Sequence, residues 1–136
     1  MTSYKKFENS EECVSLLCNA LNIQSQASKF GFEWLEVGGI LEKIREEVKE
    51  IEKEISRRDI ERVKKEVGDL YLVSLHLAQF LGIDPLECLY ISYETFRRRW
   101  EKVQLLATDV PEVPEERLEY LERLWSQVKQ EETDFF

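Results

Sequence analysis

Apolar residues recur at intervals of three and four along most of this chain, which is the spacing of amphipathic α-helices. The pattern predicts a first helix that opens at Asn9 and fades around residues 29–32. Gly38 and Gly39 are expected to interrupt the chain before a second helix over residues 40–57. The apolar seam predicted for that second helix consists of Leu41, Ile44, Val48, Ile51 and Ile55.

Three further helices are predicted in the remainder of the chain. Asp59 is suited to cap the third helix, and Gly82 is suited to end it. Residues 70–83 are apolar nearly all round, so we expect this third helix to be the central and most buried element. Residues 84–87 (Asp-Pro-Leu-Glu) are a start signal for a fourth helix, and a shorter fifth helix is expected over residues 115–129.

These elements predict an all-α fold, with a four-helix bundle-like core over residues 1–108 and an acidic C-terminal helical extension over residues 109–136. The length of 136 residues suits one domain. Nine acids and three bases in the extension give it −6 of the formal net charge of −9. An acidic chain argues against binding long nucleic acid, whose backbone requires a basic surface.

Cysteine and histidine usage narrows the chemistry further. Cys13, Cys18 and Cys88 form no CxxC pair. We expect them to be small core residues, in a protein from a reducing cytosol. The single histidine, His76, excludes HExxH zinc sites and is expected to be an ordinary packed or surface residue. The uncharged run over residues 70–83 is too short to span a bilayer, and the N-terminus lacks the apolar stretch of a signal peptide. The sequence therefore predicts a cytoplasmic protein with no membrane partner.

Two pairs of acids are the most informative polar residues. Glu47 and Glu50 are three residues apart on the second predicted helix, as are Glu66 and Asp69 on the third. A short connection makes the two helices antiparallel neighbours, so the pairs are expected to face each other. Four unpaired carboxylates in one cleft repel one another unless a cation lies between them. Ligands that are all oxygen select Mg²⁺, or Mn²⁺, over zinc.

A bland alternative exists for the first pair, because Glu is abundant on any solvated helix face. The second pair is harder to explain in that way, since Asp69 directly precedes the most apolar stretch of the chain. Gly68 adds to the functional interpretation, because a glycine inside a helix costs roughly 1 kcal/mol relative to alanine. We expect that cost to be offset by close approach of a neighbouring backbone or ligand at Gly68.

An EExxE followed by an ExxD, with 15 residues between Glu50 and Glu66, resembles the signature of the MazG-like, all-α nucleoside triphosphate pyrophosphohydrolases. The segment EVGDLYLVSLHLAQFLGIDPLECL is similar to the E-x-G-D helix of that family and the Gly-Ile-Asp-Pro turn that follows it. The segment ETFRRRWEKVQ is similar to the closing Lys-Phe-x-x-Arg-Phe-x-x-Val-Glu element of the family. The resemblance covers about residues 34–104. Residues 109–136 resemble no part of the family signature.

The resemblance implies an enzyme that hydrolyses nucleotides between the α and β phosphates, giving a monophosphate and pyrophosphate. It implies that Mg²⁺ ions are held by Glu47, Glu50, Glu66 and Asp69. With metal bound there, we expect a water to be activated and to attack the α-phosphorus. The resemblance also implies homodimers, or dimers of dimers, which the apolar residues Phe80, Leu81 and Tyr90 favour as well.

Further roles carry over by position. Trp34 stands where relatives often place an aromatic ring against the base, and Arg98 and Arg99 stand at basic positions suited to phosphate oxygens. Thr95 departs from the family, which commonly has a lysine there, so Lys43 or Arg97 is the candidate substitute for binding the triphosphate. Glu46 points away from Glu47 and is either a second layer of the metal site or solvated.

Three functions therefore remain open at the level of the sequence. The leading one is a Mg²⁺-dependent nucleoside triphosphate pyrophosphohydrolase. A narrower version acts on dUTP, dCTP or a phosphoribosyl-nucleotide. The third is a non-catalytic nucleotide sensor or protein-interaction module, supported by Thr95 and the acidic C-terminal extension.

Overall fold

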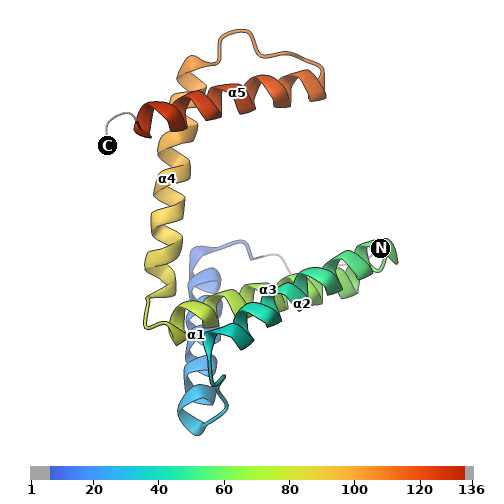
Figure 1. The fold of residues 1–136 in the computed structure, drawn as a ribbon, viewed down its shortest axis with the longest axis vertical. Helices are drawn as coiled ribbons and strands as arrows, with labels where there is room; N and C mark the ends of the chain where they lie inside the picture. The colour runs from blue at the N-terminus through green and yellow to red at the C-terminus, as the bar shows by residue number, and fades with distance from the viewer. Residues whose placement is uncertain (1–6, 134–136) are drawn as a thin grey trace. The chain divides into compact units, whose positions relative to one another are not determined.

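The computed structural model describes residues 7–133, and over that range it consists of helices with no β-strand (Figure 1). The all-α fold expected from the sequence is therefore confirmed. Among the described residues, no single helix is both long and apolar enough to cross a membrane; α3 and α4 meet that criterion only as a broken pair, by length and composition. The helices are α1 (Ser10–Phe30), α2 (Val37–Ser56), α3 (Ile60–Phe80), α4 (Pro85–Leu106) and α5 (Pro114–Thr133).

Capping residues in the sequence place the ends of α1 and α3. The Asn9 side chain accepts a hydrogen bond from the backbone N–H of Glu12 at 2.8 Å. The Asp59 side chain accepts one from the backbone N–H of Arg62 at 3.2 Å, so both predicted N-caps are confirmed. Gly82 follows α3 with a φ of 73°, a left-handed conformation that glycine adopts without strain and that ends the helix as expected.

The start of α2 differs from the prediction. The helix begins at Val37, so Gly38 and Gly39 lie in its first turn instead of interrupting the chain. A methyl group at Gly39 would lie 2.6 Å from Cε3 of Trp34, which is closer than real contacts allow. Gly39 is therefore a glycine because the indole ring of Trp34 packs directly on the backbone of the helix.

The apolar seam predicted for α2 is only partly the face that this chain buries. Three of its members are exposed and form one stripe with a spacing of seven residues, namely Leu41, Val48 and Ile55. The buried residues of α2 form a parallel stripe one position earlier, namely Ile40, Glu47 and Glu54. Two of these three are acids, so a search for apolar residues could not identify the buried face.

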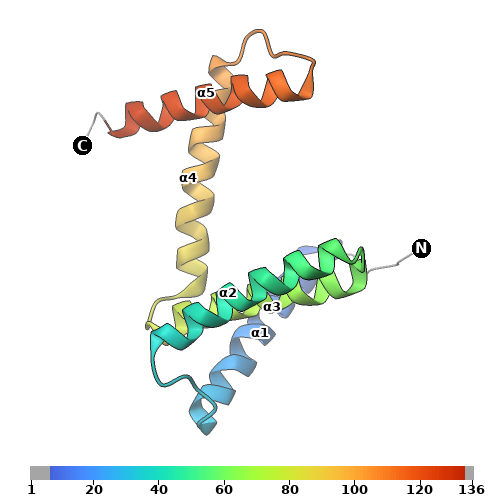
Figure 2. The ribbon, with the colours of Figure 1, turned by 45° about the vertical axis from the view of Figure 1, so that its right-hand side comes forward.

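Helices α2 and α3 lie side by side and antiparallel, and α1 packs against α3 (Figure 2). The central position expected for α3 is correct, but the expected burial is wrong, because none of its residues is fully buried. Tyr71 keeps 70% of its surface exposed, since the apolar positions of α3 extend over more faces than two helices cover. The three cysteines are also exposed, which corrects their assignment to the core.

The chain forms two compact units, Met1–Pro85 and Leu86–Phe136. The first contains α1, α2 and α3, and the second contains most of α4 together with α5. In the second unit, the rings of Phe96 and Trp125 are in contact with centroids 5.1 Å apart, and Val103 and Val128 are buried. The predicted boundary between a core ending at residue 108 and a C-terminal extension stays a prediction.

Candidate active site

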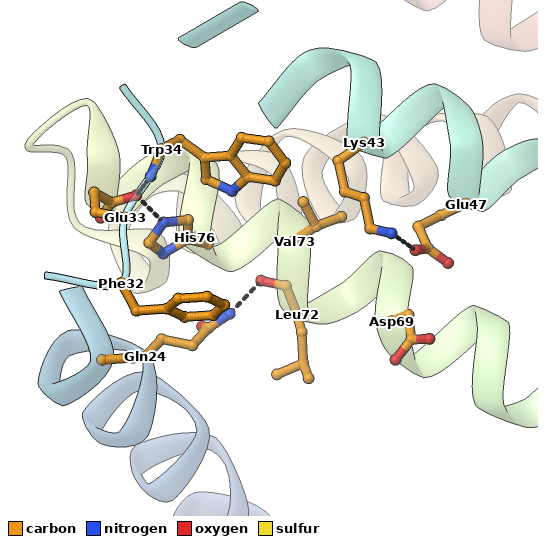
Figure 3. A pocket seen from close by; sticks show the side chains of 11 residues that line it. Gln24, Phe32, Glu33, Trp34, Lys43, Glu47, Asp69, Leu72, Val73 and His76 are labelled. Carbon is orange, nitrogen blue, oxygen red and sulfur yellow. Dashed lines mark hydrogen bonds and ion pairs between the residues drawn. The ribbon is translucent and has the colours of Figure 1, made fainter. Parts of the chain in front are cut away.

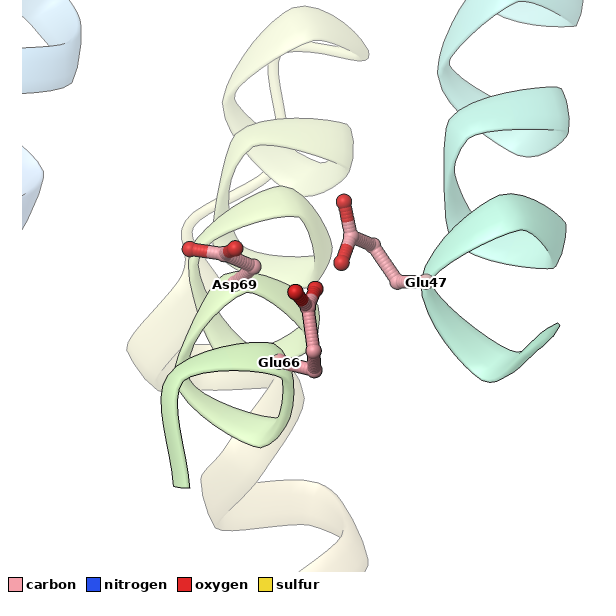
Figure 4. A group of neighbouring side chains, drawn as sticks. All are labelled: Glu47, Glu66 and Asp69. Atoms are coloured by element: carbon pink, nitrogen blue, oxygen red, sulfur yellow. The ribbon is translucent and has the colours of Figure 1, made fainter. Parts of the chain in front are cut away.

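Three carboxylates from α2 and α3 meet in the first unit (Figure 4). Glu47, Glu66 and Asp69 each offer one oxygen, and these three oxygens lie within 4.8 Å of one another. Glu66 and Asp69 lie on successive turns of α3 because they are three residues apart, and Glu47 faces them from the buried stripe of α2. Three of the four acids expected to bind metal are thus brought together, and we call them the carboxylate cluster.

Glu47 is the most buried member of the carboxylate cluster, with only 5% of its side chain exposed. Its Oε1 lies 3.1 Å from Nζ of Lys43, but its buried Oε2 has no hydrogen-bond partner in the structure. A buried carboxylate oxygen without a partner is costly, because it has lost its hydration without replacement. Glu47 therefore provides a position that a cation would satisfy.

Repulsion within the carboxylate cluster is visible at Glu66. Its pKa is raised above the usual range by a hydrogen bond with Glu47, by burial and by the negative charges of Glu47, Asp69 and Glu50. Negative charges held this close to one another disfavour the ionised form of Glu66, and a cation between them would relieve that repulsion. An oxygen-only donor set with this charge fits a hard divalent ion such as Mg²⁺ or Mn²⁺.

Two lysines lie against the carboxylate cluster. Lys43 on α2 contacts Glu47, and Lys65 on α3 places its Nζ 2.6 Å from both carboxylate oxygens of Asp69. The pKa of Lys43 is raised, chiefly by its hydrogen bond with Glu47, and that of Lys65 is raised, chiefly by its hydrogen bond with Asp69. The negative charge of the cluster is therefore partly neutralised by the chain itself.

A cavity of about 560 Å³ opens beside the carboxylate cluster (Figure 3). Glu47, Asp69 and Lys43 line its acidic end, and the rings of Phe32 and Trp34 line its other end. A concave site with aromatic walls and a few charged groups is the usual form of a small-molecule pocket. The cavity has room for a planar ring system at one end and for a charged group at the other.

The aromatic end of the cavity is held by Glu33, which lies between the two ring-bearing residues in the sequence. Its Oε1 lies 2.7 Å from Nε2 of His76 and accepts a hydrogen bond from the Trp34 backbone N–H at 2.8 Å, and its Oε2 accepts one from Ser28 at 2.5 Å. Burial acts to raise the pKa of Glu33, but the hydrogen bonds from Ser28, His76 and the Trp34 amide lower it overall. This anchoring fixes the α1–α2 connection, from which Phe32 and Trp34 project.

Proteins with similar sequences provide evidence for the family to which this chain belongs. The model of the MazG nucleotide pyrophosphohydrolase domain matches residues 37–103, which include the whole carboxylate cluster. The chain belongs to the MazG-like family. Over 121 residues it is 32% identical to the nucleoside triphosphate pyrophosphohydrolase of Escherichia coli K12, covering 87% of this chain and 46% of that protein. Over 117 residues it is 34% identical to the nucleoside triphosphate pyrophosphohydrolase/pyrophosphatase MazG of Thermotoga maritima, covering 85% of this chain and 45% of that protein. The chain thus spans about half the length of these relatives.

In this MazG-like chain, two other acids that were considered for the site, Glu50 and Glu46, lie outside the carboxylate cluster. Glu50 is not in the group of three, and its side chain lies 4.0 Å from Nζ of Lys53. Its charge still contributes to the raised pKa of Glu66, so its role as a fourth ligand stays a prediction. Glu46 is exposed and lies 3.7 Å from Nζ of Lys43, which places it behind that lysine and outside the cluster.

The expected substrate-binding residues fall into both compact units of the MazG-like chain. Trp34 and Lys43 line the cavity, and their roles toward the base and the triphosphate stay predictions. Arg98 and Arg99 lie in the second unit, where their Nε atoms are 3.3 and 2.9 Å from the carboxylate of Glu132 on α5. In the structure, the charges of these two arginines are therefore engaged by the C-terminal helix, and their contact with phosphate stays a prediction.

Two other polar residues of the closing element, Arg97 and Thr95, also interact with groups on their own helix. Arg97 is held by Glu94 at 2.7 Å and by Glu101 at 2.8 Å. Thr95 donates a hydrogen bond to the carbonyl oxygen of Ile91 at 2.8 Å. Arg97 is therefore committed to ion pairs on its own helix, and Lys43 is the candidate substitute for the missing lysine that does line the cavity.

Sequence reasoning missed several residues that line the cavity of this MazG-like chain. Phe32 and Gln24 line it, as do Glu33 and His76, whereas His76 was expected to be an ordinary packed or surface residue. Glu33 and His76 are 43 residues apart, so no helical spacing connects them. The only available signal was the position of Phe32 and Glu33 next to Trp34 in the sequence.

Proposed function

We propose that this protein is a Mg²⁺-dependent nucleoside triphosphate pyrophosphohydrolase that hydrolyses the α–β phosphate linkage and releases a monophosphate and pyrophosphate. The observation that carries the proposal is the buried, unpartnered oxygen of Glu47 within a group of three carboxylates at one end of a cavity. The family match supports the same activity, as do the E. coli and T. maritima relatives, both of which are named nucleoside triphosphate pyrophosphohydrolases.

The residues present fit a divalent cation. Glu47, Glu66 and Asp69 would hold it, with Glu50 proposed as a fourth ligand. When bound, Mg²⁺ or Mn²⁺ would lower the pKa of a water and offset negative charge on phosphate oxygens. The protein itself supplies no Ser–His or Cys–His pair in the cavity for nucleophilic catalysis among its described residues. Attack by water on a phosphorus atom is therefore the chemistry that this donor set favours, and the α-phosphorus is the position that the proposed reaction requires.

The aromatic end of the cavity is suited to the nucleoside. The ring of Trp34 rests on the backbone at Gly39, and Phe32 lines the same end, so a base has aromatic surface against which to stack. Lys43 lies between this end and the carboxylate cluster, where an ammonium group is placed to meet phosphate oxygens. Arg98 and Arg99 keep their proposed role toward phosphate, which requires them to exchange Glu132 for the substrate.

A homodimer, or a dimer of dimers, is part of the proposal. The exposed stripe of Leu41, Val48 and Ile55 on α2 and the partly exposed apolar surface of α3 are what a second bundle would cover. We also propose a cytoplasmic location, because exposed free thiols and nucleoside triphosphates both suit a reducing cytosol.

A pyrophosphate-release assay with Mg²⁺ over a panel of nucleoside triphosphates tests the proposal. We expect release of pyrophosphate and the matching monophosphate, and no release when the metal is chelated. Release from one pyrimidine triphosphate alone would favour the narrow-specificity version. No release from any nucleotide, with divalent metal still bound, would favour the nucleotide sensor.

A further inference from the structure

Two lysine–carboxylate ion pairs with the same spacing along a helix involve the carboxylate cluster. On α2, Lys43 precedes its partner Glu47 by four residues, and on α3, Lys65 precedes its partner Asp69 by four residues. Residues four apart on a helix are neighbours, so each pair forms within its own helix. The two helices thus present two ammonium groups to the position where Glu47, Glu66 and Asp69 meet.

Lys65 contacts more of the Asp69 carboxylate than Lys43 contacts of the Glu47 carboxylate. The Nζ of Lys65 lies 2.6 Å from both oxygens of Asp69, whereas Lys43 contacts one oxygen of Glu47 and leaves the other without a partner. A metal ion that binds Asp69 must therefore take oxygens that an ammonium group now holds. Two cations at the same carboxylate repel each other, so metal binding displaces Lys65.

Displacement of Lys65 requires little change in the fold. Its side chain is 72% exposed and has a flexible four-carbon stem, and its ion pair in the structure is with Asp69. Lys43 differs, because it keeps a second acid, Glu46, at 3.7 Å. Lys43 thus retains an ion pair when it leaves Glu47, whereas Lys65 gives up the ion pair that occupies both oxygens of Asp69.

We propose that Lys65 exchanges partners at this site, serving as the counter-ion of Asp69 without metal and as a contact for substrate phosphate oxygens with metal bound. The inference rests on the proposed function, and it assigns a substrate-binding role to Lys65. A displaced ammonium group beside a metal site meets the anionic phosphates that arrive there, and lysine binds phosphate as a point charge. Arg97 is held by Glu94 and Glu101 on its own helix, so the charge missing at Thr95 is supplied by Lys65 together with Lys43.

Metal binding without nucleotide tests the first half of the exchange. We expect the Kd of Mn²⁺, measured by electron paramagnetic resonance, to fall by about 2- to 5-fold in Lys65→Met, the range of an exposed ion pair that no longer competes. Lys64→Met is the matched control, because it removes the same charge from the adjacent residue, whose ion pair is with Glu61 at 2.8 Å. An equal change in both variants, or none in Lys65→Met, would overturn the proposal.

Nucleotide binding with metal tests the second half. We expect the affinity of an α,β-methylene nucleoside triphosphate at saturating Mg²⁺ to fall by roughly 3- to 10-fold in Lys65→Met, since one charge-assisted phosphate contact is lost. Lys64→Met is expected to retain the affinity of the unmodified protein. Unchanged analogue binding in Lys65→Met would contradict the exchange even if Mn²⁺ bound more tightly.

The outcomes separate this inference from the proposed function. Failure of the unmodified protein to bind Mn²⁺ at all would defeat the proposed function, and the inference with it. Normal Mn²⁺ binding and pyrophosphate release, with no effect of Lys65→Met on either affinity, would defeat the inference alone. Because Lys65 is largely exposed, its variant is expected to keep the far-ultraviolet circular dichroism and the unfolding midpoint of the unmodified protein.

Discussion

The two ends of the cavity are built by different kinds of contact. The acidic end is made by residues at helical spacing on two antiparallel helices joined by a short turn, so its members are close in the sequence. The aromatic end is made by the α1–α2 connection, held through Glu33 by His76 on α3 and Ser28 on α1. The first end arises from local geometry, whereas the second depends on how three helices pack.

This difference also divides the expected functions. The acidic end would hold the metal and therefore governs turnover, and the aromatic end would hold the nucleoside and therefore governs affinity. Substitutions at the acidic end should lower kcat, and substitutions at the aromatic end should raise KM. The following predictions test that division, from the largest expected effect to the smallest.

Glu47→Gln should have the largest effect on activity and little harmful effect on folding. Loss of the buried charge removes a metal ligand, so we expect kcat to fall by at least about a thousandfold, the scale of an essential electrostatic group. The free energy of unfolding should stay equal or rise, because the orphaned buried carboxylate oxygen is replaced by a neutral amide. Pyrophosphate release and urea unfolding measure the two quantities. A large loss of stability would contradict the description of Glu47 as a strained, functional acid.

Gly39→Ala should disturb the aromatic end. The new methyl group would lie 2.6 Å from the Trp34 ring, so the ring must shift, at a cost of about 1–3 kcal/mol in the free energy of unfolding. KM for the nucleotide should rise roughly tenfold while kcat changes less, because the metal ligands stay in place.

Gly38→Ala is the matched control for that substitution. A methyl group at Gly38 would lie 3.5 Å from the Glu36 carboxylate, which is an ordinary contact. Helix propensity should therefore stabilise this variant by up to about 1 kcal/mol, with KM unchanged. Equal effects of the two alanines on KM would show that the Trp34 ring does not form the nucleoside end.

Glu33→Gln should give the smallest effect, and a pH-dependent one. The pKa of Glu33 is lowered in the folded protein, so its carboxylate contributes stability above the ordinary value of about 4.5 and loses it as the pH falls through the lowered pKa. The unmodified protein should thus be more stable than Glu33→Gln at neutral pH, and the difference should shrink in acid. Thermal unfolding of both proteins at neutral pH and in acid measures this difference in stability. A difference that grows in acid would contradict a stabilising role for the ionised Glu33 carboxylate.

Local features of the fold could be predicted because their signals lie within a few residues. Asn9 and Asp59 cap the helices that they were expected to cap, and the spacing of Glu66 and Asp69 placed both on one face of α3. The start of α2 could not be predicted from Gly38 and Gly39, because the reason for Gly39 is a tertiary contact with Trp34.

Features that depend on packing between helices were missed for a physical reason. The buried face of α2 carries Glu47 and Glu54, so a rule that places apolar residues inside selects the neighbouring stripe instead. That rule is reliable only where the interior is apolar, and a metal site requires the opposite. The contact between Glu33 and His76 has no periodic signal, which is why the anchoring of the aromatic end was not foreseen.

The most direct test of the account is pyrophosphate release by the Asp69→Asn variant with Mg²⁺ and a nucleoside triphosphate. Asp69 is half-buried, belongs to the carboxylate cluster and lines the cavity. We therefore expect its carboxylate to be required for metal binding but not for helix formation. The account predicts that the unmodified protein releases monophosphate and pyrophosphate, and that the variant releases neither while keeping its helical circular dichroism. Retained pyrophosphate release by a folded Asp69→Asn protein would contradict the assignment of the carboxylate cluster as the catalytic metal site.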